Sequence, residues 1–244
     1  DGTHTFEVLS VDNSTNKDPS PASFNWKVDT MAPTTNINAA IDGNNSTITN
    51  SSNTKSNTLT FEFSGNDTGG VGIDHLECSL DGTSFSACIS PVQFTSANLL
   101  DGTHTFMVIA QDKVGNMMTT PVLFNWTVDT LPPTTAINTA IDGNNGTLVS
   151  GNSTMSTSMA FTFAGNDIGG QKGNGVGIKQ IECSIDNSNF TTCVSPIQFD
   201  NLTEGVHRLE VVSEDKVGNK GSTPSSFNWT IDTKAPSTSI FSAT

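Results

Sequence analysis

The chain has 244 residues, 34% of them hydrophobic, and its 24 Asp and Glu outnumber its 10 Lys and Arg, which gives a formal net charge of −14 at pH 7. This charge argues against binding to nucleic acid, which needs basic patches, and against contact with anionic membrane surfaces. It suits a self-repelling surface in salty surroundings with divalent cations, or simply a long polymer that its acidity keeps soluble.

The first residues of the chain belong to a sequence motif that recurs later in the chain. The letters DGTHTF at residues 1–6 return at residues 101–106, and a looser copy, EGVHRL, lies at residues 204–209. Later copies gain five residues at Gln171–Gly175 and lose two before EGVH. Both changes fall in Gly- and Asn-rich stretches, which is typical of loops on a fixed scaffold.

A second phrase marks where each repeat ends. FNWKVDT, FNWTVDT and FNWTIDT are each followed by a Pro-containing joint, and a new repeat begins there. We therefore predict the C-terminal part of a truncated repeat at residues 1–30, complete repeats at 31–130 and 131–233, and the start of another at 234–244. Because both ends are cut inside a repeat, we expect a segment of a longer protein, in which a missing signal peptide or membrane span carries no information.

Alternating apolar residues predict β-strands, and no helical stripe is convincing. In HTFEVLS, His4, Phe6 and Val8 are expected to face inward. In the first complete repeat, the predicted strands are TTNINAAI, TLTFEFSG with Phe61 and Phe63 on one face, IDHLECSL, SFSAC, VQF, the segment around HTF, and FNWTVD. About seven short antiparallel strands in about 100 residues predict an all-β fold of tandem immunoglobulin-like β-sandwiches.

The cysteines form two pairs of equal spacing, Cys78 with Cys88 and Cys183 with Cys193. Zinc would need four ligands, and the nearby His75 becomes Gln180 in the next repeat, so a metal role would not recur. A DG turn midway between Cys78 and Cys88 favours a hairpin disulfide instead. One disulfide per repeat would contribute about 2–3 kcal/mol and would indicate an oxidising, extracytoplasmic compartment.

The run from ECSLDGTSFSACISPVQF through LLDGTHTFMVIAQDKVGN to FNWTVDTLPPTT resembles the bacterial and archaeal Ig-like repeats of large surface and secreted proteins. The resemblance covers essentially the whole chain, apart from the polar stretch DGNNSTITNSSNTKSN. It implies stalks, adhesin shafts, surface-layer building blocks or accessory modules beside enzymes. Kinship of fold does not carry an activity, so the resemblance defines the repeat type and leaves the function open.

N-x-S/T sequons are frequent, and they predict N-linked glycans in a host that has the machinery. The eleven candidates are Asn13, Asn44, Asn45, Asn50, Asn66, Asn125, Asn145, Asn152, Asn189, Asn201 and Asn228. By strand parity, Asn125 and Asn228 face outward from the last strand. The alternative is that a chain rich in Asn, Ser and Thr produces sequons by chance.

Acidic turns recur at the ends of predicted strands in the phrases GND, DKVGN and VDT. The candidate ligands are Asp67, Asp112, Asn116, Asp129, Asp167, Asp215, Asn219 and Asp232. Hard oxygen ligands at domain junctions could hold Ca²⁺, although ordinary turn chemistry explains the same residues and is favoured here. Calcium is therefore the one candidate cofactor, and none is required.

Two further sets recur, His4, His104 and His207 at one strand start, and Trp26, Trp126 and Trp229 among apolar neighbours. We expect both sets in the core rather than in a catalytic or sugar-stacking site, since no G-x-S-x-G, HExxH or paired-Glu motif accompanies them. The chain is therefore not expected to be an enzyme.

The favoured function is structural: an extracellular or cell-surface filament, lattice or stalk of Ig-like repeats. The expected partners are neighbouring repeats and other copies of the chain, with no nucleic acid and no direct membrane contact, and with glycans as the candidate covalent modification. The alternative is an adhesin that binds carbohydrate or protein, or an accessory domain of a secreted enzyme.

Overall fold

The computed structural model describes residues 1–169 and 175–241. All the regular secondary structure within these residues is β-strand. The predicted all-β fold is thereby confirmed. Most of the predicted insertion at residues 171–175 lies outside the described residues. The chain divides into two compact units, residues 1–127 and residues 128–244, except that 53–55 and 100–102 group with the second unit.

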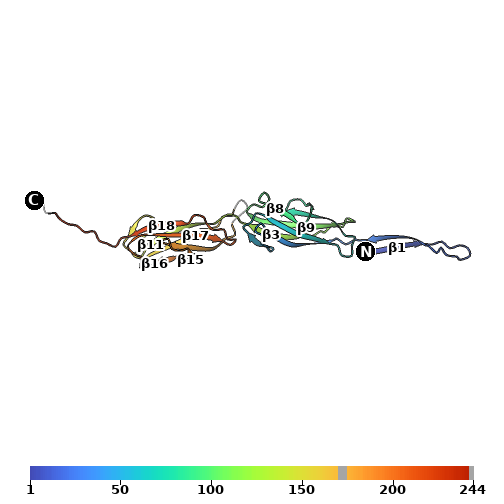
Figure 1. The fold of residues 1–244 in the computed structure, drawn as a ribbon, viewed down its shortest axis with the longest axis horizontal. Coiled ribbons are helices and arrows are strands. Elements are labelled where there is room, and N and C mark those ends of the chain that lie inside the picture. The colour runs from blue at the N-terminus through green and yellow to red at the C-terminus, as the bar shows by residue number, and fades with distance from the viewer. Residues whose placement is uncertain (170–174, 242–244) are drawn as a thin grey trace. The chain divides into compact units, whose positions relative to one another are not determined.

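The first complete repeat is a sandwich of two sheets (Figure 1). One sheet has the order β3-β5-β8, formed by β3 (Thr34–Asp42), β5 (Leu59–Asn66) and β8 (Val92–Phe94). The other has the order β4-β10-β9-β6-β7, formed by β4 (Ser52–Thr54), β10 (Val122–Val128), β9 (Gly102–Asp112), β6 (Ile73–Leu80) and β7 (Ser86–Cys88).

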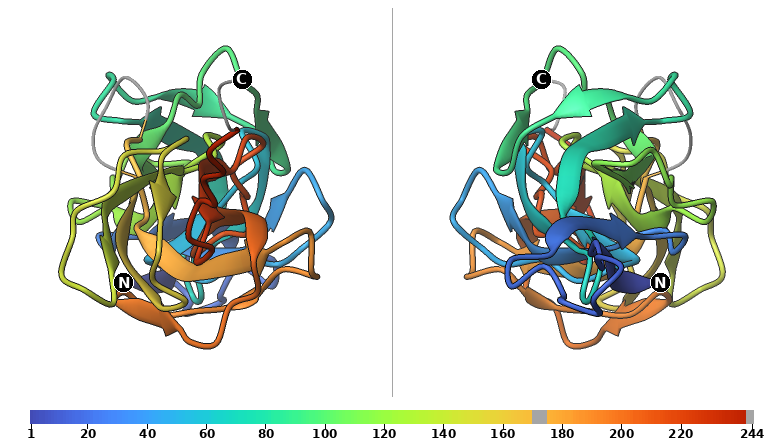
Figure 2. Two further views of the ribbon diagram at one scale, coloured as in Figure 1. Left: turned by 90° about the vertical axis from the view of Figure 1, so that its left-hand side faces the viewer. Right: turned by 90° about the vertical axis from the view of Figure 1, so that its right-hand side faces the viewer.

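The second complete repeat has the same two sheets in the same order. The three-stranded sheet contains β11 (Thr134–Asp142), β13 (Met159–Asn166) and β16 (Ile197–Phe199). The five-stranded sheet contains β12 (Ser153–Thr154), β18 (Ser225–Ile231), β17 (Gly205–Asp215), β14 (Ile178–Ile185) and β15 (Thr191–Thr192). Figure 2 shows the same strands from the two ends of the first view.

Within the described residues, each complete repeat thus has eight strands where the sequence predicts about seven. The additional strands, β4 and β12, have three and two residues and lie in the polar stretch after β3 and β11. β12 pairs with β18 in parallel, an arrangement that alternating hydrophobicity cannot reveal in so short a segment.

The core lies between the two sheets. In the second repeat, Phe161 of β13 is fully buried, and its ring centre lies 5.2 Å from that of Trp229 and 5.4 Å from that of Phe227, both on β18. In the first repeat, Phe61 stacks on Phe106 with ring centres 4.3 Å apart. The inward face predicted from the alternation in TLTFEFSG is therefore confirmed.

The long edge strands β3 and β11 each carry a β-bulge at the same place. The register with the neighbouring strand shifts between Ile37 and Ala39 in β3, and between Ile137 and Thr139 in β11. A bulge interrupts the regular row of backbone groups that another strand would need for pairing.

The hairpin of β1 (Gly2–Val8) and β2 (Ala22–Val28) repeats the pairing of β17 with β18, and it places His4 opposite Trp26 and Phe6 opposite Phe24. The inward position predicted for His4, Phe6 and Val8 is wrong, because Phe6 is 59% exposed and Val8 52%. Trp26, which we expected in the core, is 42% exposed, whereas its equivalent Trp126 is 1% exposed. Among the described residues, no three-stranded sheet covers this hairpin.

This difference predicts what would bury the hairpin. Placing a copy of residues 31–100 directly before Asp1 reproduces the junction before Asp101, because both positions start the phrase DGTHTF. We expect Trp26 to become buried, since the added strands offer the apolar face that β3, β5 and β8 offer β9 and β10. Acrylamide quenching and the tryptophan emission maximum would report the change.

The control is the same fusion carrying Phe6→Ser, which should leave Trp26 partly quenchable. If Trp26 stays as accessible in the fusion as in the original chain, the assignment of residues 1–30 to the C-terminal part of a truncated repeat fails.

Candidate functional site

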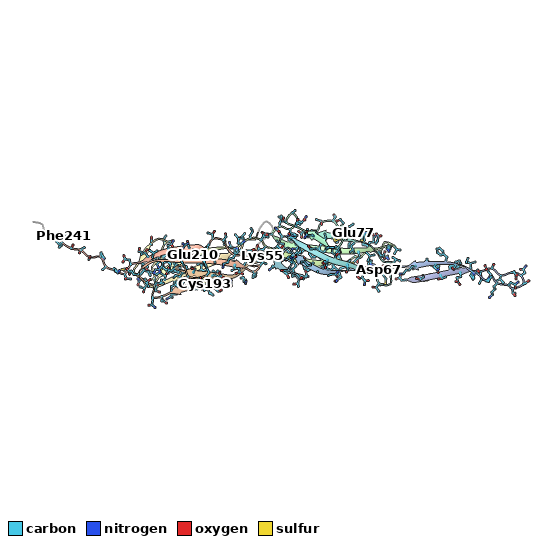
Figure 3. All side chains as sticks on the ribbon, in the orientation of Figure 1. Lys55, Asp67, Glu77, Cys193, Glu210 and Phe241 are labelled. Atoms are coloured by element: carbon cyan, nitrogen blue, oxygen red, sulfur yellow. A yellow bond between two sulfur atoms is a disulfide. The ribbon has the colours of Figure 1, made fainter. Side chains whose placement is uncertain are left out.

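Both predicted disulfides are present. They join Cys78 to Cys88 and Cys183 to Cys193, with Cα atoms 5.8 Å apart in each pair, and no described cysteine is free. Each bond closes the hairpin between two neighbouring strands of the five-stranded sheet; Cys193 is labelled in Figure 3. Cys78 and Cys183 are buried, so the bonds border the core.

Three carboxylates gather at one place in each compact unit. Asp29, Asp67 and Asp112 form the first cluster, and Asp129, Asp167 and Asp215 form the second. Within each cluster, one oxygen from each side chain lies within 4.8 Å of the others. The members occupy the same three phrases, VDT, GND and DKVGN, so the cluster is a repeated feature of the fold. Figure 3 labels Asp67.

Most of the predicted metal ligands lie in or beside these clusters. Asp29, which the predicted ligand set omits, completes the first cluster. It is the middle residue of VDT, as Asp129 is, and Asp232 is the middle residue of the equivalent IDT, so the phrase marks Asp29 as a joint residue in the sequence. Asp232 follows β18 and is exposed, and among the described residues it belongs to neither cluster.

Asp215 is held rigidly by its own turn. The side chain is fully buried, and Oδ1 accepts hydrogen bonds from the backbone N–H groups of Val217 and Asn219, both at 2.9 Å. Asn219 Nδ2 donates to Asp215 Oδ2 at 2.7 Å and to the backbone carbonyl of Asp129 at 2.9 Å. The Asn219 amide therefore links the DKVGN turn to Asp129, in the joint that precedes the second complete repeat.

Asp112 occupies the equivalent turn in the first unit. Burial favours its neutral form, but the hydrogen bonds from Asn116 and from the backbone of Val114 and Gly115 outweigh this and lower the pKa of Asp112. Asn116 Nδ2 also reaches the backbone carbonyl of Asp29, at 3.1 Å. Asn116 thus repeats the tie that Asn219 makes in the second unit.

The joint aspartate of each repeat is built into the repeat that follows. Asp129 is buried, and its Oδ2 accepts a hydrogen bond from Val176 N at 2.9 Å. Asp29 Oδ2 accepts one from Val71 N at the same distance. These contacts explain why the second compact unit begins at Val128, ahead of the repeat boundary predicted at residue 131.

Asp167 lacks the hydrogen-bond donors that stabilise its neighbours. Its Oδ2 accepts a hydrogen bond from Gly177 N at 2.6 Å, but its Oδ1 is buried with no hydrogen-bond partner. Burial raises the pKa of Asp167, and the nearby carboxylates of Asp129 and Asp215 raise it further. The hydrogen bond from Gly177 N and the charge of Lys216 act in the opposite direction, but the pKa of Asp167 remains raised.

Glycine is required beside the second carboxylate of each cluster. A Cβ atom on Gly70 would overlap the Asp67 carboxylate, and one on Gly175 would overlap that of Asp167. The two glycines are equivalent in the repeats, so a glycine lies close against the cluster in both units. This close approach keeps bulky groups away from the carboxylates.

A hard cation fits this donor set. Ca²⁺ prefers carboxylate and carbonyl oxygens, and the buried Oδ1 of Asp167 offers a lone pair that no described donor satisfies. Asp167, Asp129 and Asp215 would hold the ion in the second unit. The ion would supply positive charge where three carboxylates converge.

The sequon asparagines lie on the surface. Ten of the eleven are exposed, and Asn125 is half-buried, with its Oδ1 accepting a hydrogen bond from Thr105 Oγ1 at 2.7 Å. Asn45 and Asn145 adopt positive φ angles of 59° and 62° in equivalent turns, a conformation that asparagine tolerates well. The exposed positions leave room for a glycan.

The recurring histidines and tryptophans of the complete repeats are core residues, as expected. His104 is 1% exposed and His207 4%, and Trp126 and Trp229 are each 1% exposed. The two indole N–H groups have no hydrogen-bond partner, which leaves a buried donor in each core. In residues 1–169 and 175–241, no helix is long and apolar enough to cross a membrane.

Sequence comparison places part of the chain beside a known family. Residues 90–166 match the family described as bacterial Ig-like domain (group 3). The matched segment runs from the second half of one complete repeat into the first half of the next. No curated protein matches the chain.

Several solved structures are similar at low sequence identity. The fibronectin(III)-like modules of Clostridium thermocellum CbhA are 13% identical with a TM-score of 0.35, covering 86% of this chain and 100% of theirs. A Ca²⁺-stabilised adhesin that helps an Antarctic bacterium bind ice is 18% identical with a TM-score of 0.38, covering 95% of this chain and 57% of its own. A two-domain fibronectin type III segment of chicken tenascin is 9% identical with a TM-score of 0.28, covering 82% of this chain and 99% of its own.

Removing the second disulfide should destabilise its repeat. Replacing Cys183 and Cys193 by Ala opens a loop with a sequence separation of 10. We expect the free energy of unfolding of the second unit to fall by about 2–3 kcal/mol, because the unfolded chain regains conformational freedom. Urea unfolding followed by far-UV circular dichroism would measure it.

The matched control is the same pair of substitutions at Cys78 and Cys88, which should destabilise the first unit and leave the second unchanged. A second unit whose unfolding midpoint does not move after loss of its disulfide would contradict the prediction.

Proposed function

We propose that this chain is part of an extracellular spacer, a stalk of Ig-like repeats whose joints are stiffened by Ca²⁺. The observation that carries the proposal is that the joint aspartate of each repeat belongs to the carboxylate cluster of the next repeat. A cation bound there would join the last strand of one repeat to two loops of the following one. Bending at the joint would then require breaking ligand bonds.

Three further features support an extracellular location. Two disulfides persist where the surroundings are oxidising. The net charge of −14 keeps a long array of repeats apart from its neighbours. The exposed sequons can accept glycans that would shield the surface from proteases.

The edges of the sandwich favour a stalk over a lattice formed by sheet extension. Both long edge strands, β3 and β11, carry a bulge at Asn38 or Asn138, where a second copy would have to pair. The neighbouring edges, β8 and β16, have only three residues each. Neither edge offers a long, flat row of backbone groups.

A binding module is the weaker candidate. Sugar-binding surfaces present aromatic rings to solvent, but in the described part of the two complete repeats Phe190 is the one exposed aromatic side chain, at 37%. Lys220 lies over that ring, with its ammonium nitrogen 5.8 Å from the ring centre. No specific observation favours this alternative or a role beside an enzyme.

Calcium should stabilise both units. At a free Ca²⁺ concentration one hundred times the dissociation constant, each occupied site adds about 2.7 kcal/mol to the free energy of unfolding. The double variant Asp167→Asn with Asp215→Asn should lose this response in the second unit only, because two of its three carboxylates are gone. Calorimetry with and without a calcium chelator would show two transitions with different sensitivity.

The control is Asp200→Asn, which removes an exposed carboxylate outside both clusters and should keep the full response. If neither unfolding transition of the wild-type protein shifts when Ca²⁺ is added or chelated, the calcium part of the proposal is wrong.

Electron microscopy of the native full-length material tests the spacer itself. We expect separate strings of beads, each bead one repeat, because joined repeats without long free edges do not associate laterally. Continuous sheets or ordered filaments of many chains would overturn the stalk and favour self-assembly.

A further inference from the structure

His207 is a buried histidine whose two ring nitrogens both face hydrogen-bond acceptors. Its side chain lies on β17, and the residue is 4% exposed. Nδ1 lies 2.7 Å from Asp186 Oδ2, and Nε2 lies 2.7 Å from the backbone carbonyl oxygen of Thr203. The ring stacks on Trp229, with ring centres 5.4 Å apart and planes inclined by 27°.

These contacts require a proton on each ring nitrogen or one on the aspartate. A carbonyl oxygen only accepts, so Nε2 must carry hydrogen to bond Thr203. Neutral histidine then has no hydrogen left for Nδ1, which would face the lone pairs of an ionised Asp186. The second oxygen of Asp186, Oδ1, already accepts a hydrogen bond from Arg208 N at 2.9 Å. The observed contacts therefore need one more proton on the His207–Asp186 pair than a neutral histidine and an ionised carboxylate together carry.

The electrostatic surroundings agree with this count. Burial lowers the pKa of His207, but the contacts with Thr203 and Asp186 outweigh burial and raise it above the ordinary value of 6.5. Two other charged groups close to His207 in the sequence form hydrogen bonds elsewhere. The Arg208 side chain bonds Glu210, and Glu204, in the loop before β17, bonds Thr233.

We propose that His207 and Asp186 form a proton-dependent clasp in the second repeat, which ties the turn between β14 and β15 to the core. The turn is the one closed by the Cys183–Cys193 disulfide. This inference is independent of the spacer function and of calcium.

The clasp fixes a tight turn. Asp186 and Asn187 have φ angles of 51° and 61°, in the left-handed region that Asp and Asn adopt more readily than other non-glycine residues. The backbone N–H of Asp186 donates to the Arg208 carbonyl at 2.9 Å, and its side chain bonds both His207 and the Arg208 N–H. Loss of the extra proton removes one of these ties and leaves a buried lone pair facing a carboxylate.

The direction of the pH effect follows from the raised pKa. A histidine with a higher pKa in the folded state contributes its full stabilisation below the unfolded value of 6.5. The contribution is lost as the pH rises through the folded-state value. The second repeat should therefore be firmer in mild acid, and its hairpin turn should loosen in alkali.

The first repeat repeats the contact at Nδ1 and the stacking on tryptophan. His104 Nδ1 lies 2.7 Å from Asp81 Oδ2, and its ring stacks on Trp126 at 5.4 Å. Asp81 also lies in a left-handed turn, with φ at 52°. This recurrence supplies a matched position for the test.

The test is a pH titration of the imidazole rings in the whole chain by two-bond ¹H–¹⁵N correlation spectroscopy. We expect His207 to show two protonated nitrogens at neutral pH and to titrate above 6.5. Asp186→Asn should move its midpoint to lower pH, because the charge that favours the imidazolium is gone. The matched variant Asp81→Asn should leave the titration of His207 unchanged.

Stability provides a second readout. The melting temperature of the second unit should fall between pH 6 and pH 9, and His207→Gln should remove the part of that fall caused by the clasp. A wild-type His207 that is neutral at pH 6.5 with one protonated nitrogen would overturn the proposal, as would a midpoint that Asp186→Asn does not shift.

Discussion

The burial of one phenylalanine between the two sheets of each repeat determines where the other residues lie. Phe161 packs against Trp229 and Phe227, and a shift of one residue in its strand would turn its side chain to solvent. With that register fixed, β13 ends at Asn166 and β17 ends at Asp215. The next residue after β13, Asp167, therefore meets the end of β17 at one end of the sandwich, and the carboxylate cluster follows from the core packing.

Within the clusters, the number of donors facing each carboxylate decides its chemistry. Asp112 receives several hydrogen bonds from its own turn, so its ionised form is stabilised even though it is 2% exposed. Asp167 is more exposed as a residue but has a buried oxygen without a donor and two like charges beside it. Turn chemistry thus explains the aspartates of DKVGN on its own, whereas it does not explain the aspartate of GND. The two explanations for the acidic residues, ordinary turn chemistry and cation binding, therefore apply to different aspartates of the same cluster.

Much of this arrangement could be predicted from the sequence, because periodicity, equal cysteine spacing and repeated phrases are local signals. The pattern of HTFEVLS identifies which face of β1 is apolar, but it cannot say whether a second sheet covers that face, and the expectation for Phe6 was wrong for this reason. The short strands β4 and β12 escape because two or three polar residues are too few to show an alternating pattern. The convergence of Asp129, Asp167 and Asp215 depends on strand order, which no single segment encodes. Asp29 is the exception, since its VDT phrase was present in the sequence and pointed to the joint.

The proposed cation site and the proposed proton clasp would act independently, although one strand carries a residue of each. His207 lies near the start of β17 and Asp215 at its end, eight residues later. At about 3.3 Å per residue, the two lie roughly 26 Å apart along the strand. Charges interact weakly in solution beyond about 8 Å at physiological salt, so protonation of the histidine should barely alter the affinity of the carboxylates for a cation. If both proposals hold, a repeat would respond to pH at its disulfide-closed hairpin while its joint would respond to the ionic composition of the medium.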